Sequence, residues 1–301
     1  RSTLFPYTTL FRSRDEHLIA NAEDAMDEAR RRGKNQVYVY SEELKDRAHE
    51  EHTISEKLID AIENDKFYML YQPKVDVKTK LVNGYEALVR MKDSKIGPAQ
   101  FIPVAEKNGW IWRIGRITTE LTIRQMAVWR GLGYPLQPVS INYSSRQISD
   151  SEYVSFLEEI LQRYNIPSNL VEIEITESVF LDRTAHAELL LDRFRKAGIR
   201  LVMDDFGIGY SALGYLTYIP VETIKLDKSL VDNYLVQGND SIIKDVINLS
   251  HDLGKGMVVE GVETGWQYER LKEFGADTIQ GYYFSKPLEP KEAIAFQNAN
   301  S

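Results

Sequence analysis

Residues 201–210 read LVMDDFGIGY, an apolar run that ends in two adjacent aspartates and a turn containing two glycines. Successive side chains of a strand point to opposite faces, so Asp204 and Asp205 cannot both be ordinary solvent-facing charges within a strand. Where a strand ends, the backbone turns, and both carboxylates can converge on a cation above the strand. The alternative is a turn that only stops the strand, with the two acids capping a helix. Recurrence of the pattern along the chain favours the cation site.

Composition limits the kinds of protein that this chain can be. Its 301 residues, 43% of them hydrophobic, are enough for one large barrel-type domain or two smaller ones. A net charge of −8 argues against binding a nucleic-acid polymer, but not against a small phosphate ligand held by metal. The lack of cysteine excludes disulfides, thiolate zinc sites and cysteine nucleophiles, and it favours the cytoplasm. No apolar run approaches the roughly 18 residues that span a bilayer, so we expect no membrane contact from this fragment, although a longer protein can be anchored upstream.

The first part of the chain divides into three segments. Residues 1–13, RSTLFPYTTLFRS, match from Thr3 onward an in-frame translation of a sequencing-adapter oligonucleotide, so we treat them as a non-native leader. In residues 14–40, apolar positions at helical spacing lead to RRRG and then to a short strand, which predicts a helix followed by a strand. The charged residues 41–53 predict a linker helix, and SEKLIDAIEN at 55–64 predicts a separate capped helix that begins the domain at 54–301.

Strand and helix patterns alternate through the rest of the chain. Strands are predicted at 67–75, 81–91, 138–142, 171–176, 200–204, 223–227, 256–260 and 278–284, with helices between most of them, such as 185–197 and 241–253. About eight strands interleaved with helices predict an α/β fold, a TIM-type (β/α)8 barrel. The first two strands flank a Lys-Thr-Lys turn and resemble a hairpin, so we expect one strand to run antiparallel to the others.

Polar side chains recur at the carboxyl ends of these predicted strands. They are Glu86, Asn142, Glu174, Glu177, Asp204, Asp205, Lys225, Glu260, Glu263 and Gln280. In a barrel, active sites form at that face from several strands. So many carboxylates would repel one another without cations, and carboxylates with one amide suit Mg²⁺ or Mn²⁺ better than zinc. Two metal ions that share a bridging carboxylate are used for in-line displacement at phosphorus.

Ordered motifs across residues 54–300 resemble those of the EAL domain, the cyclic-di-GMP phosphodiesterase family. Glu86-Ala87-Leu88 matches the triplet that names the family, and the flanking matches are YQPKVD at 71–76, FIPVAE at 101–106, DDFGIGYS at 204–211, IKLD at 224–227, EGVE at 260–263 and QGYYFSKP at 280–287. Ile208 and Met91 replace a frequent Thr and Trp, and neither change removes a ligand; Ile208 could alter loop order or dimer coupling.

Residues 14–40 resemble the final helix and strand of a GGDEF (diguanylate cyclase) domain, but they lack the GG[DE]EF loop, so we claim no cyclase activity.

The EAL resemblance implies the metal ligands. One Mg²⁺ or Mn²⁺ ion would be held by Glu86, Asn142, Glu174 and Asp204, and Asp204 would bridge to a second ion held partly by Asp205.

The resemblance also implies roles around the attacking water and the substrate. Lys225 would orient hydroxide or offset phosphate charge, and Glu260 would be the general base or a second-metal contact, with Glu263 and Gln280 completing the water network. Glu177 would anchor the loop 206–211 without touching metal. Arg90 would pair with a substrate phosphate, while Gln72 and Leu88 would contact the ligand. The alternatives are a structural ion pair for Lys225 and a helix-N-terminal acid for Glu263.

The implied activity is hydrolysis of cyclic-di-GMP to linear pGpG by water that two metal ions activate, within bacterial second-messenger signalling. The competing hypothesis is a receptor that binds cyclic-di-GMP without cleaving it, which loss of Glu86, Asp204, Lys225 or Glu260 would indicate; all four are present. A further hypothesis, which adds to hydrolysis and does not replace it, is that upstream domains set the rate of hydrolysis. The family resemblance also implies a homodimer that forms near the loop 206–211. His251-Asp252 mimics the HD metal dipeptide of another phosphodiesterase class, but we reject it because it lies in a helical pattern without a partner cluster.

Overall fold

The computed structural model describes residues 41–181, 184–207, 216–236 and 238–299, together with a few helical positions among residues 22–30. The predicted leader at 1–13, the predicted strand at 36–40 and most of the helix before it therefore lie outside the described residues, as do Ile208 and the rest of the loop up to Ser211. Among the residues described, no helix is both long and apolar enough to cross a membrane.

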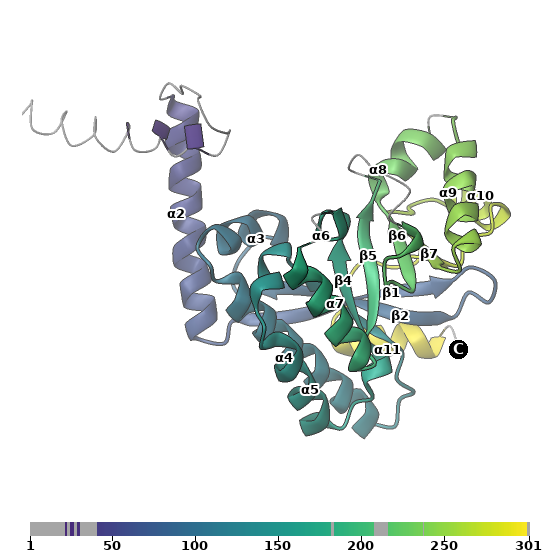
Figure 1. Cartoon of the computed structure of the whole chain (residues 1–301), viewed down its shortest axis with the longest axis horizontal. Coiled ribbons are helices and arrows are strands. Elements are labelled where there is room, and N and C mark those ends of the chain that lie inside the picture. The colour runs from purple at the N-terminus through teal and green to yellow at the C-terminus, as the bar shows by residue number, and fades with distance from the viewer. Residues whose placement is uncertain are drawn as a thin grey trace, which may run out of the picture.

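Within the described residues, eight strands close into one barrel in chain order (Figure 1). They are β1 (Phe67–Asp76), β2 (Val82–Met91), β3 (Val139–Tyr143), β4 (Val171–Thr176), β5 (Arg200–Phe206), β6 (Thr223–Leu226), β7 (Gly256–Val259) and β8 (Thr278–Ile279). β1 pairs antiparallel with both β2 and β8, and all other neighbours are parallel. This confirms the predicted TIM-type barrel with one antiparallel strand.

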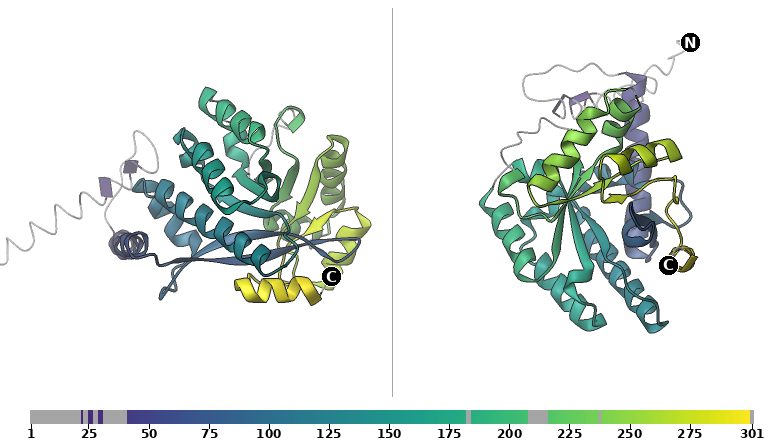
Figure 2. Two further views of the ribbon diagram at one scale, coloured as in Figure 1. Left: turned by 90° about the horizontal axis from the view of Figure 1, so that it is seen from below. Right: turned by 90° about the vertical axis from the view of Figure 1, so that its right-hand side faces the viewer.

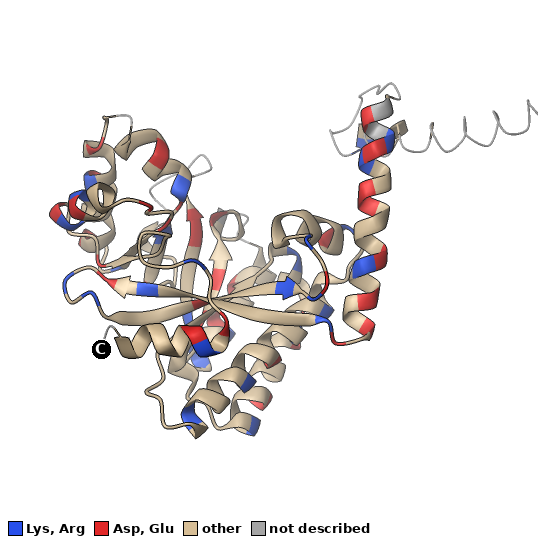
Figure 3. Cartoon of the chain, turned by 180° about the vertical axis from the view of Figure 1, so that it is seen from behind, with Lys and Arg blue, Asp and Glu red and all other residues tan. Residues whose placement is uncertain are grey.

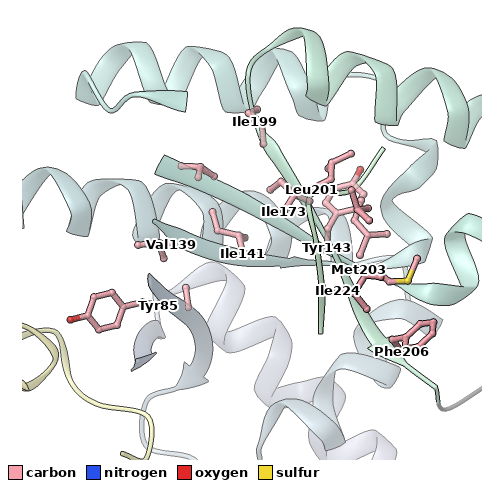
Figure 4. Packing of buried hydrophobic residues seen from close by; sticks show 14 of the residues in the cluster. Tyr85, Val139, Ile141, Tyr143, Ile173, Ile199, Leu201, Met203, Phe206 and Ile224 are labelled. Carbon is pink, nitrogen blue, oxygen red and sulfur yellow. The ribbon is translucent and has the colours of Figure 1, made fainter. Parts of the chain in front are cut away.

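Helices surround the strands (Figure 2). They are α2 (Glu42–Glu63), α3 (Pro98–Lys107), α4 (Ile111–Gly131), α5 (Tyr153–Tyr164), α6 (Glu177–Leu181), α7 (Ala185–Lys196), α8 (Lys228–Leu230), α9 (Ser241–Asp252), α10 (Gly265–Glu273) and α11 (Pro290–Ala299), with short turns η1 (Ser145–Ser149), η2 (Ser168–Leu170) and η4 (Val231–Leu235). The helices cover apolar side chains that point outward from the strands, such as Ile141, Ile173, Leu201 and Met203 (Figure 4). Burial of this layer is the main stabilising contribution to the fold.

The barrel interior, in contrast, is polar. In β4, Glu172 and Glu174 alternate with the buried residues Ile173 and Ile175, so the two acids share the opposite face of the strand. Lys74 of β1 bonds to Glu174, although β1 and β4 are not neighbours in the barrel. A contact between such strands must cross the interior. The strand periodicity therefore directs acids and bases inward and the apolar residues toward the helices.

The predicted break between a linker helix and a capped helix is wrong. α2 is one continuous helix over Glu42–Glu63, with red and blue bands of charge along its length (Figure 3). Ser55 lies within it, so it caps nothing. The helix continues because Ile54, Leu58 and Ala61 pack on Phe101 of α3 and on the outer end of the β1–β2 hairpin. The boundary proposed between residues 53 and 54 therefore lies inside a helix.

The last strand is shorter than predicted, because β8 contains only Thr278 and Ile279. The chain then turns against the segment that follows β7: Gly281 lies so close that a Cβ would be 2.1 Å from the carbonyl oxygen of Val262. The amide of Tyr283 donates to that same carbonyl at 2.9 Å. Gln280 consequently stands at the start of a turn at the mouth of the barrel rather than inside a strand.

Candidate active site at the mouth of the barrel

Lys225 of β6 lies at the centre of the acidic residues predicted from sequence. Its Nζ is 2.7 Å from Oε2 of Glu174 and 2.7 Å from Oε1 of Glu260, 3.1 Å from Oδ1 of Asp204, and 3.5 Å from Oε2 of Glu86. These carboxylates come from β2, β4, β5 and the residue after β7. The barrel thus brings together side chains up to 174 positions apart between Glu86 and Glu260. We call these five residues the mouth cluster.

Glu86 occupies an unexpected place in its strand. It lies in the middle of β2 rather than at the end, because the residues after Ala87 pair only with β1 and extend past the barrel as a hairpin. Glu86 is therefore next to the last residue of β2 that pairs with β3. Glu86 therefore lies at the mouth because the pairing of β2 with β3 ends there, although β2 itself continues beside β1.

Glu174 has two cationic partners. Burial opposes its ionisation, but Lys225 and Lys74 outweigh that effect and lower the pKa of Glu174 to about 2. Burial likewise opposes the charged form of Lys225, yet the surrounding carboxylates raise its pKa well above the ordinary value. Both groups are therefore charged in the folded protein, and each stabilises the other.

The other acids of the mouth cluster are less well neutralised. Burial raises the pKa of Glu260 to about 8, against the opposing effect of Lys225 and with a further contribution from Asp204. Burial, together with the charges of Glu174 and Asp204, also raises the pKa of Glu86 despite Lys225. One ammonium cannot neutralise four carboxylates, so the mouth has an excess of negative charge.

The two aspartates of residues 201–210 do both reach the mouth. Asp205 adopts a left-handed backbone (φ 57°), and its amide donates to Oδ1 of Asp204 at 3.0 Å. Aspartate tolerates this conformation better than most residues, although a non-glycine residue there carries strain. Burial and the neighbouring charge of Asp204 raise the pKa of Asp205 to about 6. The turn replaces strand alternation at Asp205, which allows consecutive acids to face one site.

Three amides surround Glu86. Asn142 donates to its Oε1 at 2.7 Å, and Gln280 donates to its Oε2. Gln280 also donates to Oε1 of Gln72 at 3.2 Å, and Gln72 donates to the carbonyl of Ser285 at 3.2 Å. Oε1 of Gln280 is buried without a hydrogen-bond partner in the structure. A buried acceptor of this kind normally has a water or ligand donor.

Two hollows open beside the cluster and share Glu86. One, of about 570 Å³, runs toward α3 and α4 and is lined by Leu88, Asn142, Glu174, Asp205 and apolar residues such as Ile102. The other, of about 340 Å³, is lined by Gln72, Asp204, Lys225, Glu260, Glu263 and Gln280. A ligand with a flat ring system and a charged phosphate can contact both surfaces from one position over Glu86.

The remaining predicted residues lie around this centre. Glu177, almost fully buried, accepts a hydrogen bond from the amide of Gly207 at 3.2 Å, while the rest of its predicted loop lies outside the described residues. Glu263 precedes the helix cap Thr264 and forms an exposed ion pair with Lys228, so it is not itself the cap. Arg90 donates to the carbonyl of Val89 at 2.8 Å and lines neither hollow.

The donors at the mouth fit a small hard cation. Among the residues that the structure describes, no three acidic or histidine side chains are already spaced to enclose a metal ion, because the Lys225 ammonium lies between them. The side chains are nevertheless carboxylates and amides, and their negative charge exceeds that of the one lysine. Oxygen donors with excess negative charge suit Mg²⁺ or Mn²⁺.

Sequence reasoning missed a second polar layer beneath the mouth, which we call the floor cluster: Lys74, Ser140, Glu172 and Arg200. Glu172 accepts from Ser140 at 2.7 Å and pairs with Arg200 at 3.0 Å and with Lys74 at 3.4 Å. The alternation of acids and isoleucines in VEIEIT was the available signal. Glu172 lies near the start of β4, whereas the sequence predictions placed the site at the carboxyl ends of the strands.

Comparisons with known proteins agree with this architecture. The EAL domain family model matches residues 55–287. The chain is 35% identical to signaling protein YkoW of Bacillus subtilis, in an alignment that covers 93% of the chain and 35% of that relative. It is 32% identical to cyclic di-GMP phosphodiesterase PdeR of Escherichia coli K12, in an alignment that covers 93% of the chain and 42% of that relative. It thus spans less than half of either relative.

A solved structure extends the comparison to the fold. PaMucR phosphodiesterase in a c-di-GMP complex superposes with a TM-score of 0.75 at 30% identity, covering 80% of this chain and 99% of that one. An EAL domain protein from Listeria monocytogenes is 33% identical, with a TM-score of 0.68, and covers 82% of this chain and 98% of its own. Together with the family match, these findings show that the chain belongs to the EAL domain family.

Proposed function

We propose that the chain hydrolyses cyclic-di-GMP to linear pGpG. The observation that carries the proposal is the convergence of Glu86, Glu174, Asp204 and Glu260 on a single point at the mouth, each within 3.5 Å of the Lys225 ammonium. Such an excess of converging carboxylates is costly unless the site takes up cations. PdeR and PaMucR, which are similar to this chain, are named as phosphodiesterases.

Glu86, Asn142, Glu174, Asp204 and Asp205 are the residues that would hold Mg²⁺ or Mn²⁺. When bound, the two ions would lower the pKa of water and offset charge on the phosphate. In the reaction, a water oxygen forms a bond to phosphorus, and the bond from phosphorus to the 3′ oxygen breaks. The attacking water loses a proton and the 3′ oxygen gains one.

Side chains of the protein would transfer the proton and orient the attacking water. We assign Glu260 as the group that accepts the proton of the attacking water, because it lines the smaller hollow and is fixed by Lys225 at 2.7 Å. Lys225 orients that water and offsets phosphate charge. Gln280 has an unpaired Oε1 with which to accept from the same water, and Glu263 lies at the rim of this hollow.

Substrate binding would use the two hollows. Leu88 provides apolar contact in the larger one, and Gln72 lines the smaller one. Arg90 would turn away from the Val89 carbonyl to pair with a phosphate. Glu177 would hold the loop that begins at Gly207.

We further propose a homodimer formed near that loop, a cytoplasmic location, and a GGDEF-derived origin for residues 14–40. Each follows from the family resemblance and the sequence.

The direct test is incubation of the purified chain with cyclic-di-GMP in Mg²⁺, Mn²⁺ or EDTA, with products separated by chromatography. Metal-dependent pGpG supports the proposal. Tight nucleotide binding without product, in folded and metal-loaded protein, would contradict it and make the chain a receptor. No binding and no product would exclude both functions.

A further inference from the structure

A line of alternating charges passes through the barrel interior beneath the mouth. Arg200 pairs with Glu172 at 3.0 Å, Glu172 with Lys74 at 3.4 Å, Lys74 with Glu174 at 2.8 Å, and Glu174 with Lys225 at 2.7 Å. Barrel interiors of this type are usually filled by branched apolar side chains. Buried charges are costly even when paired, so a purely structural core would not need them. The proposed reaction assigns no role to Lys74.

Lys74 and Lys225 divide the two oxygens of Glu174 between them. Nζ of Lys74 contacts Oε1, and Nζ of Lys225 contacts Oε2. Lys225 belongs to the mouth cluster, whereas Lys74 also contacts Glu172 in the floor cluster. Oε1 therefore points to the floor and Oε2 points to the mouth.

The Lys74 ammonium is itself held firmly. It donates to Ser140 and Glu174 and approaches Glu172, so its three protons have three acceptors on β3 and β4. Its side chain is only 5% exposed. An ammonium fixed in this way keeps the Glu174 carboxylate from rotating both oxygens toward the mouth.

The number of oxygens that a carboxylate offers affects which cation it suits. Mg²⁺ is small and requires near-octahedral geometry, whereas Ca²⁺ is larger, takes six to eight oxygens and accepts carboxylates through both oxygens. We propose that Lys74 is a positioning residue that makes Glu174 a one-oxygen ligand, so that the site prefers Mg²⁺ and Mn²⁺ over Ca²⁺. This inference rests on the metal site of the proposed function.

A simpler role for Lys74 would be to neutralise charge. In that case its removal would increase the affinity for every divalent cation by a similar factor, since all carry the same charge. Positioning predicts a change in the ratio of affinities instead. The ratio of Ca²⁺ to Mg²⁺ affinity therefore separates the two roles.

The experiment uses the whole chain and Lys74→Met, which keeps the unbranched side chain up to the position of Cε and removes the ammonium. Free Mn²⁺ is followed by electron paramagnetic resonance while Mg²⁺ or Ca²⁺ displaces bound Mn²⁺, and circular dichroism checks folding. We expect Ca²⁺ affinity relative to Mg²⁺ to rise about tenfold, which is the lower end of the change in metal affinity that follows loss of a hydrogen-bond partner of a metal ligand. Arg200→Gln is the control, because it removes a charge from the same line without contacting Glu174. It should leave the ratio unchanged.

An unchanged ratio in folded Lys74→Met, or an equal change in Arg200→Gln, would overturn the inference. If Lys74→Met does not fold, a crystal structure of the unaltered chain with Mn²⁺ decides the matter. Glu174 should then ligate through Oε2 with Oε1 on Lys74; ligation through both oxygens would contradict the proposal. Neither measurement uses hydrolysis, so a chain that binds Mn²⁺ but produces no pGpG would fail the proposed function and not this one.

Discussion

The mouth and floor clusters lie next to each other in one barrel, yet their charges balance differently. At the floor, Lys74 and Arg200 both pair with Glu172, and Lys74 also pairs with Glu174 of the mouth cluster, so two cations face the one carboxylate of the floor cluster. At the mouth, four carboxylates surround the single ammonium of Lys225. Both clusters are largely buried.

This difference in charge balance is the one expected between a cluster that stabilises the barrel, as at the floor, and a cluster that binds a cation, as at the mouth. A buried charge set that is already balanced gains little from a further ion, whereas an unbalanced one is stabilised by any cation that enters. Burial raises the pKa of Glu260 to about 8 and Lys225 does not offset it, whereas Lys225 and Lys74 together outweigh burial and lower the pKa of Glu174 to about 2. We therefore propose that the mouth cluster binds the ligand and that the floor cluster supports it.

The largest expected effect is the loss of activity on metal removal. EDTA should abolish pGpG formation and lower the thermal stability, and Mn²⁺ at 100 times its dissociation constant should add about 2.7 kcal/mol to the free energy of unfolding. Chromatography and thermal melting measure the two responses. Full hydrolysis in EDTA would remove the basis for treating the mouth as a cation site.

Asp204→Asn tests the mouth against the floor by a single-atom change. It should reduce the hydrolysis rate by about 10²–10³-fold or more, because a residue that we propose would hold the metal ions loses its charge. The matched floor variant, Glu172→Gln, should stay within about tenfold of the unaltered rate. Similar losses in both variants would contradict the distinction between the clusters.

Lys225→Met removes the only cation of the mouth. In EDTA it should destabilise the protein by about 3–5 kcal/mol, since four carboxylates then lack their common partner. Mn²⁺ should restore much of this stability. Lys74→Met should respond less to Mn²⁺, because Glu172 keeps Arg200 and Glu174 keeps Lys225. Denaturant unfolding with and without Mn²⁺ measures both, and an equal response would show that the two lysines are equivalent.

The smallest effect is expected outside both clusters. Glu177→Ala removes the acceptor for the Gly207 amide and should lower hydrolysis by about tenfold while leaving Mn²⁺ affinity nearly unchanged. Glu159→Ala, an exposed acid on α5, is the control and should alter neither quantity. An equal loss of rate and of metal affinity would make Glu177 a ligand rather than a loop anchor.

Much of the fold follows from local pattern. Strand and helix patterns predicted the eight strands, and the Lys-Thr-Lys turn predicted the antiparallel pair β1–β2, which the structure confirms. The predictions were wrong where contacts between residues far apart in the sequence set the bounds of a helix or strand. α2 continues past Ser55 because it packs on α3, and β8 ends at Ile279 because the next residues turn against Val262.

By itself, the sequence determined which residues carry charge, on which strand each lies and toward which face it alternates, since these depend on neighbours a few positions away. Only the tertiary structure decided that Lys225 stands among four carboxylates and that Lys74 reaches Glu174 from across the barrel. Those distances depend on closure of all eight strands, and no local spacing encodes them. Closure also places Glu86 at the mouth from the middle of its strand.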